Sequence, residues 1–434
     1  MKISIEGYKS IAQKRCLEIG GLTILSGANS SGKSSFMQPL LLIKQTLEND
    51  FDAGSLMLDG PNVKLTDSSQ IISRVPSEEQ GFFTVSISNE KTETIASYKF
   101  WKKRGIHIDS IVHRSDEFKD GIRIHLGLKP SEIESLFISE HFTQIKQILG
   151  KEKKVTWKVV RDRCFLELQM QVGAKSFPFG GGFTPARNLE LLSRRLIHVP
   201  GLRGNPERSY KVAISESVYP GSFEKYVASI IHKWKFSKSK GEKAKFETLR
   251  EQLKFLGLAS SIETVSINDT SLEIRISRHS GSTSTDLDHV NIADVGFGVS
   301  QTLPVLVALL AANKDQVVYI EQPELHLHPR AQFNLATIIA NAVAERNINV
   351  VIETHSSILI RGVQILVAKR QLDAKSVSLN WFTQDPQSGQ TNITEAKLDK
   401  YGAFGDWPED FDSVSLEVET MYLDSVEEAL ENEV

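Results

Sequence analysis

A glycine-rich segment near the start of the chain has the residue types and spacing that bind phosphate. Gly27–Ser35 matches the pattern G-x-x-x-x-G-K-[ST] at every fixed position. Glycines let such a loop wrap around a phosphate with its backbone N–H groups pointing inward, and the N-terminus of a following helix adds partial positive charge. Lys33 is placed to reach the β- and γ-phosphates of a nucleoside triphosphate, and Ser34 to bind Mg²⁺. The predicted phosphate-binding residues are Gly27, Asn29, Ser30, Ser31, Gly32, Lys33, Ser34 and Ser35.

Acidic and histidine side chains follow two apolar runs in the second half of the chain. Val317–Ile320 ends in Glu321-Gln322-Pro323-Glu324, and Asn349–Ile352 ends in Glu353-Thr354-His355-Ser356. Carboxylates such as Glu321 and Glu324, at the C-terminal end of the first of these runs, lie beside a phosphate loop, where Mg²⁺ and an attacking water are found. A lone histidine is usually a packed core residue, but its place at a strand end favours a functional role for His355.

The flanking sequence supplies the elements that these motifs need. Leu22–Ser26 reads as a short strand and Phe36–Leu47 as a helix, and this context separates the motif from a chance glycine-rich turn. Hydrophobic periodicity predicts further elements. Helices are expected over 130–149, 223–234, 246–256, 329–345 and 358–368, with an apolar helix ending at 312. Strands are expected over 1–11, 82–88, 94–100, 106–112, 122–128, 155–160, 164–171, 272–277 and 376–383.

Composition limits the class of protein. A length of 434 residues suits two or three domains, and a formal net charge of −3 carries no global signal for nucleic acid. Two cysteines exclude a disulfide framework and favour a reducing compartment. The longest apolar run, Val305–Ala312, is far shorter than a membrane span. We therefore expect a soluble cytoplasmic protein without a membrane contact.

The order of the motifs resembles that of the ABC-type ATPase heads of the structural-maintenance, RecF and overcoming-lysogenization-defect (OLD) families. It is most similar to the stand-alone bacterial AAA-type ATPases whose C-terminus carries a Trp-Pro-rich domain of unknown function. The segments that carry the resemblance are Gly27–Ser35, Asp294–Gln301, Glu321–Arg330, Glu353–Ser356, Gly405–Phe411 and the loop Pro200–Pro206 with Arg203.

The resemblance implies an α/β fold, an ABC-type ATPase head of the P-loop NTPase class assembled from both ends of the chain, with a long α+β insertion. It implies four parts. These are an N-terminal lobe with the phosphate loop (1–100), an insertion (101–270), a C-terminal lobe with the signature loop, the acidic strand end and the histidine (271–395), and an acidic tail (396–434).

The resemblance also implies roles for single residues. Glu321 takes the Mg²⁺-side acidic position of the Walker B motif, and His355 resembles the switch histidine that senses the γ-phosphate. The loop with Gly296, Gly298 and Ser300 resembles the signature loop, which in these families contacts the nucleotide held by the other protomer. The implied assembly is a head-to-head homodimer with ATP between the subunits. Gln38 and Gln70 are both candidates for the glutamine-bearing loop of such heads, and the role of Arg203 is open.

One residue departs from the family pattern. Gln322 stands where these proteins usually have a glutamate that polarises the attacking water. A neutral amide orients water but accepts no proton, and loss of a general base typically costs about 10²–10⁴-fold in rate. The hypothesis is slow turnover, with ATP as a long-lived assembly ligand. Glu324 is the alternative base, so Glu321, Gln322, Glu324 and His355 form the predicted catalytic set.

Three smaller features have two interpretations each. The basic and aromatic stretch 233–245 could grip a DNA backbone or form a solvated helix junction. His326 and His328 could bind metal, but they lack further ligands in sequence, so a dimer-facing loop is the better interpretation. Asp410 and Asp412 could bind a nuclease metal, but ten acidic residues and no lysine or arginine after Pro408 favour a surface tail.

Three functions are compatible with these features. The leading hypothesis is an ATPase subunit of a bacterial anti-phage defence complex, with a separate nuclease of the His-Asn-His (HNH) type or a toxin, as in Septu-like systems. Because the sequence after the head is short, we expect this subunit to carry no nuclease of the TOPRIM type. The second is a DNA-repair ATPase of RecF type that binds DNA directly through the insertion, and the third is a non-hydrolysing scaffold.

Overall fold

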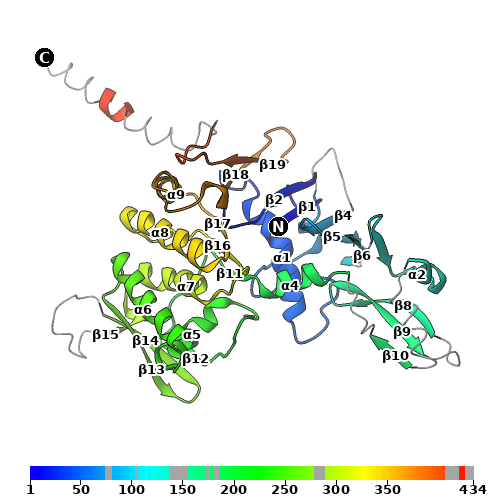
Figure 1. Cartoon of the computed structure of the whole chain (residues 1–434), viewed down its shortest axis with the longest axis horizontal. Helices are drawn as coiled ribbons and strands as arrows, with labels where there is room; N and C mark the ends of the chain where they lie inside the picture. The colour runs from blue at the N-terminus through cyan, green and yellow to red at the C-terminus, as the bar shows by residue number, and fades with distance from the viewer. Residues whose placement is uncertain are drawn as a thin grey trace.

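The computed structural model of the chain describes residues 1–73, 81–102, 105–116, 118–136, 155–172, 175–178, 185–277, 289–405 and 420–425. A central sheet has the strand order β11-β16-β17-β3-β18-β19, in which β11 to β18 are parallel and β19 is antiparallel. The N-terminal strand β3 lies between two strands from the C-terminal part of the chain (Figure 1). The expected α/β fold assembled from both chain ends is therefore confirmed. The strands are β3 (Leu22–Gly27), β11 (Ile197–Val199), β16 (Val317–Glu321), β17 (Asn349–Glu353), β18 (Val377–Gln384) and β19 (Thr391–Lys397).

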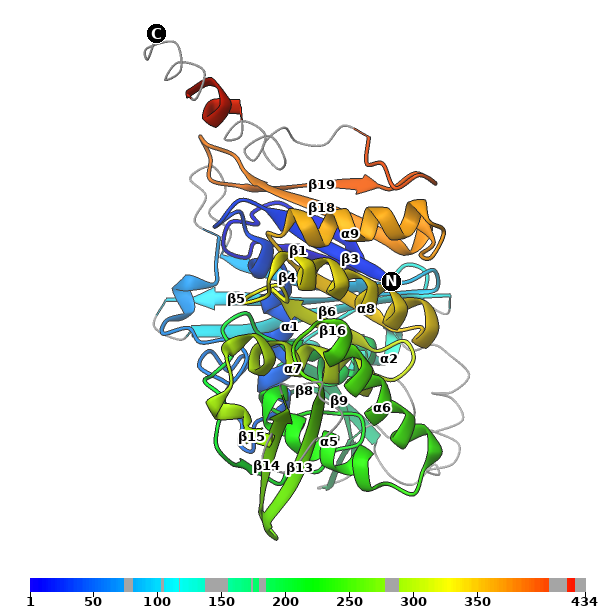
Figure 2. The ribbon, with the colours of Figure 1, turned by 90° about the vertical axis from the view of Figure 1, so that its left-hand side faces the viewer.

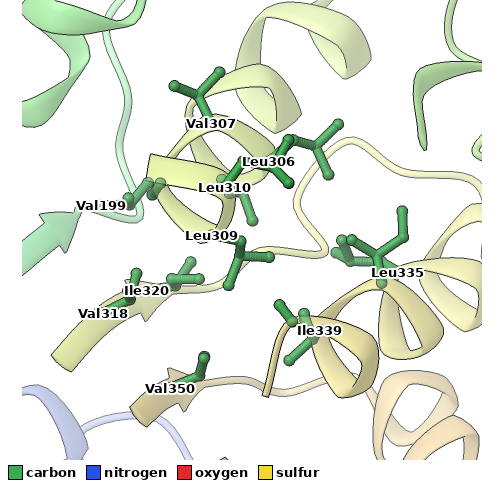
Figure 3. Close-up of a cluster of buried hydrophobic side chains, with 14 of the residues drawn as sticks. Val199, Leu306, Val307, Leu309, Leu310, Val318, Ile320, Leu335, Ile339 and Val350 are labelled. Carbon is green, nitrogen blue, oxygen red and sulfur yellow. The ribbon is translucent and has the colours of Figure 1, made fainter. Parts of the chain in front are cut away.

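Side chains of the parallel strands alternate between two separate cores. Val318, Ile320 and Val350 pack against two helices, α7 (Phe297–Ala311) and α8 (Pro329–Arg346), and these side chains interdigitate in Figure 3. A third helix, α9 (Ser357–Ala368), packs against α8. Tyr319 and Val351 face the opposite core, which contains the helix that follows the phosphate loop. Side chains two positions apart on a strand point to the same face of the sheet. Glu321, two positions after Tyr319, and Glu353, two positions after Val351, therefore lie on the phosphate-loop side.

The helix after the phosphate loop, α1 (Lys33–Glu48), is buried around most of its surface. Its core includes Leu25 and Phe382 of the central sheet and also residues of a second, antiparallel sheet with the order β2-β1-β4-β5-β6-β7. The helix thus packs between two sheets, which explains why it is buried on most of its sides, including at the polar residues Lys44, Gln45 and Thr46. The antiparallel strands are β1 (Lys2–Glu6), β2 (Arg15–Glu18), β4 (Phe82–Ser88), β5 (Thr92–Trp101), β6 (Gly105–Ser115) and β7 (Ile122–His125).

Two peripheral parts come from the middle of the chain. One pairs α5 (Val227–Phe236) and α6 (Lys240–Phe255) with the sheet of β12, β13, β14 and β15, and it lies at the opposite end of the molecule from β18 and β19 (Figure 2). The other is the sheet β10-β9-β8 with the helix α2, on another side of the molecule (Figure 1). The remaining elements are α2 (Pro130–Leu136), β8 (Val155–Asp162), β9 (Phe165–Val172), β10 (Lys175–Pro178), α4 (Arg187–Arg195), β12 (Tyr210–Lys211), β13 (Ser261–Asn268), β14 (Ser271–Ser277) and β15 (His289–Asn291).

The expected boundaries differ from the observed pairing in three places. The boundary at residue 100 falls inside one sheet, because β5 pairs with β6. Residues 197–199, expected in the insertion, form β11 of the central sheet. Leu398 and Phe404 are buried in the main core, so the start of the expected tail packs on the head. The division into four parts otherwise stays a prediction.

Several predicted elements lie partly or wholly outside the described residues. Only the first turns of the predicted helix 130–149 are described, as α2. The glycine run 180–182, the Trp407-Pro408 pair and most of the acidic tail, with Asp410 and Asp412, fall outside the described part. In the segments that the structure describes, no helix combines the length and apolar character needed to cross a bilayer.

Candidate functional site

Two glycines of the phosphate loop occupy positions that admit no side chain. Gly27 has φ 138°, and a Cβ there would lie 2.1 Å from the carbonyl oxygen of Phe382 on β18. Gly32 has φ 100°, and a Cβ there would lie 2.3 Å from the Oγ1 of Thr391 on β19. Both glycines are needed for backbone conformation and close packing. The fold of this chain therefore requires glycine at both of these motif positions.

The rest of the loop presents donors at the start of α1. Lys33 is buried, and its Nζ donates to the carbonyl oxygens of Gly27 and Ala28 at 3.1 and 2.7 Å. Burial lowers the pKa of Lys33, while nearby Glu353 raises it. The helix has no side-chain cap at Gly32, so its first N–H groups are available to an anion. Among the other predicted residues, Asn29 and Ser30 are exposed, Ser31 is buried, and Ser34 and Ser35 are half-buried.

Two carboxylates end the neighbouring strands β16 and β17. Glu321 and Glu353 are register partners in the parallel pair. Ser34 Oγ donates to Glu353 Oε1 at 2.8 Å, and Tyr319 donates to Glu353 Oε2 at 3.0 Å. Burial raises the pKa of Glu353, and the charge of Glu321 adds to that rise. The structure thus brings a carboxylate to the hydroxyl predicted to bind Mg²⁺, and that carboxylate belongs to Glu353.

Glu321 contacts a different element. Its Oε1 lies 3.1 Å from His198 Nε2, and its Oε2 accepts from the Gly201 N–H at 3.0 Å. His198 stacks on Tyr319 with ring centroids 5.3 Å apart. Burial alone would raise the pKa of Glu321, but the hydrogen bonds from His198 and Gly201 outweigh burial and lower it. Glu321 therefore holds the start of the loop 200–206.

The residues predicted to handle water and the terminal phosphate surround the end of β17. Gln322 has φ 44°, and its N–H donates to the Glu353 carbonyl at 2.7 Å. Glu324 is 9% exposed, and its Oε1 accepts from the His355 N–H at 3.0 Å. Burial and the positive charge of Lys33 both lower the pKa of His355. His355 therefore lies close enough to the phosphate loop to interact with the charge of Lys33. The contacts of Glu324 favour a role in positioning His355.

The predicted signature residues lie at the start of α7 and are not joined to the phosphate loop of the same chain by any hydrogen bond or ion pair between described residues. Gly296 is exposed, and Ser300 Oγ donates to the Phe297 carbonyl at 3.1 Å. A Cβ at Gly298 would lie 3.3 Å from the His326 carbonyl, and the Phe297 ring packs on the His326 ring at 5.7 Å. The signature segment therefore packs on the loop that follows the acidic strand end.

Arg203, whose role the sequence left open, connects these two segments. It is buried, and its guanidinium donates to the carbonyls of Gln301 on α7 and Glu321 on β16 at 2.9 and 2.8 Å. Gln301 Nε2 donates back to the Gly204 carbonyl at 3.2 Å. Burial lowers the pKa of Arg203 to about 10, against the opposing charges of nearby glutamates. Arg203 thus ties the acidic strand end to the signature helix.

The remaining candidates have structural partners. Gln38 on α1 accepts hydrogen bonds from Tyr8 and Lys9, and Gln70 bonds to Thr66 in an exposed turn. His328 caps α8 through the Arg330 N–H. Among the residues with described placement, no cluster of three or more histidine, cysteine, aspartate or glutamate side chains could hold a metal ion.

Sequence reasoning missed three residues of this site, Glu353, Tyr319 and His198. Glu353 had the signal that selected Glu321, an acid directly after a buried strand. Tyr319 lies within the apolar run 317–320, and His198 lies just before the loop 200–206 without a motif of its own. Their contacts depend on strands from distant parts of the chain and have no local signal.

The sheet order, the phosphate loop and the carboxylates at neighbouring strand ends define the fold of a P-loop ATPase of the broad AAA and ABC type. A family profile described as "AAA domain, putative AbiEii toxin, Type IV TA system" matches residues 222–361, which contain Glu321 and His355. No curated protein matches the chain.

Solved structures similar to this chain include three SMC heads. An Smc head bound to the C-winged helix domain of ScpA shares 13% identity, with 92% of this chain and 98% of that chain covered and a TM-score of 0.43. An SMC head from Thermotoga maritima shares 10% identity, with 92% and 98% covered and a TM-score of 0.39. A head with an extended coiled coil, bound to the C-terminal domain of ScpA derived from Pyrococcus furiosus, shares 12%, with 98% of each chain covered and a TM-score of 0.42. With TM-scores below 0.5, the fold assignment rests on the sheet and loop described above.

Proposed function

We propose that this chain binds ATP with Mg²⁺ in the cytoplasm, hydrolyses it slowly, and acts as the nucleotide-dependent switch of a bacterial defence complex. The observation that carries ATP binding is the uncapped start of α1, with Lys33 and Ser34 in its first turn and Glu353 within hydrogen-bond distance of Ser34. This is the donor and acceptor set that a nucleotide phosphate and its Mg²⁺ require.

Each residue has a separate task in the proposal. Bound Mg²⁺ would neutralise charge on the β- and γ-phosphates, and Ser34 with a strand-end carboxylate would hold it. Lys33, now bonded to loop carbonyls, would turn to the phosphates, and His355 would donate to the terminal phosphate. Gln322 would orient the attacking water without accepting its proton, which is the basis for slow turnover.

The proposed working form is a head-to-head homodimer in which the segment 296–300 of one subunit faces the nucleotide of the other. The exposure of Gly296 and of Phe297, whose side chain is 50% exposed, supports a docking role for this segment. The effector would be a separate HNH-type nuclease or toxin. Its support is the motif resemblance.

Direct DNA binding, as in a RecF-type repair ATPase, is the second candidate. Lys238, Lys240 and Lys243 are exposed where α5 meets α6, and this is the observation in its favour. Against it, Lys233 pairs with Glu242 at 3.1 Å and Lys245 lies over the Trp234 ring at 5.7 Å. Charge reversal at the three exposed lysines should abolish any DNA binding that is salt-sensitive and belongs to this surface.

Equilibrium binding of fluorescent ATP to the purified protein tests the main proposal. The wild-type protein is expected to bind ATP, and Lys33→Ala to lose that binding while retaining its thermal unfolding profile. Lys314→Ala, at an exposed lysine outside the loop, is the matched control. Equal ATP affinity in wild type and Lys33→Ala would contradict the proposal.

A further inference from the structure

Two glutamates end neighbouring strands beside the phosphate loop. The Tyr319 hydroxyl interacts with both carboxylates, but their other partners differ, because Ser34 contacts Glu353 whereas His198 and Gly201 contact Glu321. The strand β17 pairs directly with β3, and Glu353 is the register partner of Leu25, two residues before the loop begins. The strand β16 is one strand further from β3. Of the two acids, Glu353 therefore comes from the strand next to the phosphate-loop strand.

The Glu353 carboxylate is fixed at the Mg²⁺ side of the loop. Ser34 donates to one of its oxygens at 2.8 Å and Tyr319 donates to the other at 3.0 Å. Tyr319 is fully buried, so it holds the carboxylate in one orientation. A hard divalent cation takes oxygen ligands of this kind, a hydroxyl and a carboxylate on one side, and keeps waters and phosphate oxygens on the other.

The Glu321 carboxylate is occupied by the chain itself. His198 and the Gly201 N–H bind its two oxygens at 3.1 and 3.0 Å. His198 is held in place by a second contact, from its Nδ1 to Asn62 Oδ1 at 3.1 Å, and by stacking on Tyr319. Turning Glu321 toward a cation would break both of its contacts and release the start of the loop 200–206.

We propose that Glu353, and not Glu321, is the carboxylate that holds Mg²⁺ together with Ser34. Glu321 keeps the loop 200–206 attached to the end of β16, and through that loop it keeps Arg203 in place. This inference rests on the proposed ATP binding, because the cation is taken to arrive with the nucleotide.

The test is ADP binding by isothermal titration calorimetry, in Mg²⁺ and in EDTA, for wild type, Glu353→Gln, Glu321→Gln and the exposed control Glu345→Gln. In Glu353→Gln, the glutamine oxygen still accepts a hydrogen bond but is a poorer cation ligand. We expect this variant to keep the ADP affinity of the wild type in EDTA. The increase in ADP affinity that Mg²⁺ produces should be about 10–100-fold smaller than in the wild type. Glu321→Gln and Glu345→Gln should keep the Mg²⁺ dependence of the wild type. Mn²⁺ electron paramagnetic resonance provides a second measure, since bound Mn²⁺ should fall only in Glu353→Gln.

The outcomes separate this inference from the function on which it rests. No ADP or ATP binding by the wild type in either buffer would overturn both. Nucleotide binding with no effect of Mg²⁺ would overturn the inference alone, as would loss of the Mg²⁺ dependence in Glu321→Gln. Loss confined to Glu353→Gln, with unchanged thermal unfolding, supports it.

Discussion

Replacing Gly27 by alanine should lower the free energy of unfolding substantially. The residue has φ 138°, and a sparsely populated backbone conformation of this kind costs about 1–3 kcal/mol for a residue with a side chain. The new Cβ would also lie 2.1 Å from the Phe382 carbonyl oxygen, a backbone atom that moves only with β18. Overpacking of this kind costs about 1–3 kcal/mol. Together the expected loss is about 2–6 kcal/mol.

Alanine substitutions at two other glycines separate the two contributions to this loss of stability, the strained backbone conformation and the steric contact. Gly54 has φ 93° and no heavy atom within 4 Å of the point that a Cβ would occupy, so Gly54→Ala should show the conformational cost alone. Gly20 has neither a positive φ nor a near neighbour, so Gly20→Ala should be neutral or stabilising by about 0.4–1 kcal/mol. Urea unfolding followed by circular dichroism measures all three. A Gly27→Ala variant within about 1 kcal/mol of Gly20→Ala would refute the reasoning.

Three further outcomes are expected. Gln322→Glu should raise phosphate release by about 10²–10⁴-fold in a coupled assay, because it supplies a general base; an unchanged rate would remove Gln322 as the cause of slow turnover. Arg203→Met should lower the free energy of unfolding by about 1–3 kcal/mol, because buried carbonyls lose a charged donor, and urea unfolding at two wavelengths would check this. Burial raises the folded-state pKa of Glu324, so its ionisation costs stability near neutral pH and that cost disappears as the pH falls through the folded value. Glu324→Gln should therefore be more stable than wild type at pH 8, with a gain that shrinks toward pH 4.

The elements around the phosphate loop could be predicted because their signals are local. The strand before Gly27, the helix after it and the two acidic strand ends each have a complete pattern within a short segment. Their adjacency followed from the behaviour of parallel strands, whose carboxyl ends meet at one edge of the sheet.

The choice between the two acids could not be predicted from the sequence. Glu321 and Glu353 have the same local pattern. They are distinguished by His198, which contacts Glu321 and comes from a strand more than a hundred positions away in the sequence. Short strands such as β11 and β12 have too few residues for a periodicity to show. Helix α6 begins at Lys240, whereas the sequence predicted a start at Phe246. The first turns of this helix are polar and show no apolar face, so hydrophobic periodicity did not reveal them.

The most direct test of the central claim is mass photometry with parallel phosphate release, on protein with and without Mg-ATP. We expect a larger assembly that forms with ATP and persists while almost no phosphate is released. Brisk phosphate release with a cycling monomer and dimer would contradict the slow switch, and a mass that does not respond to ATP would contradict the nucleotide-dependent assembly.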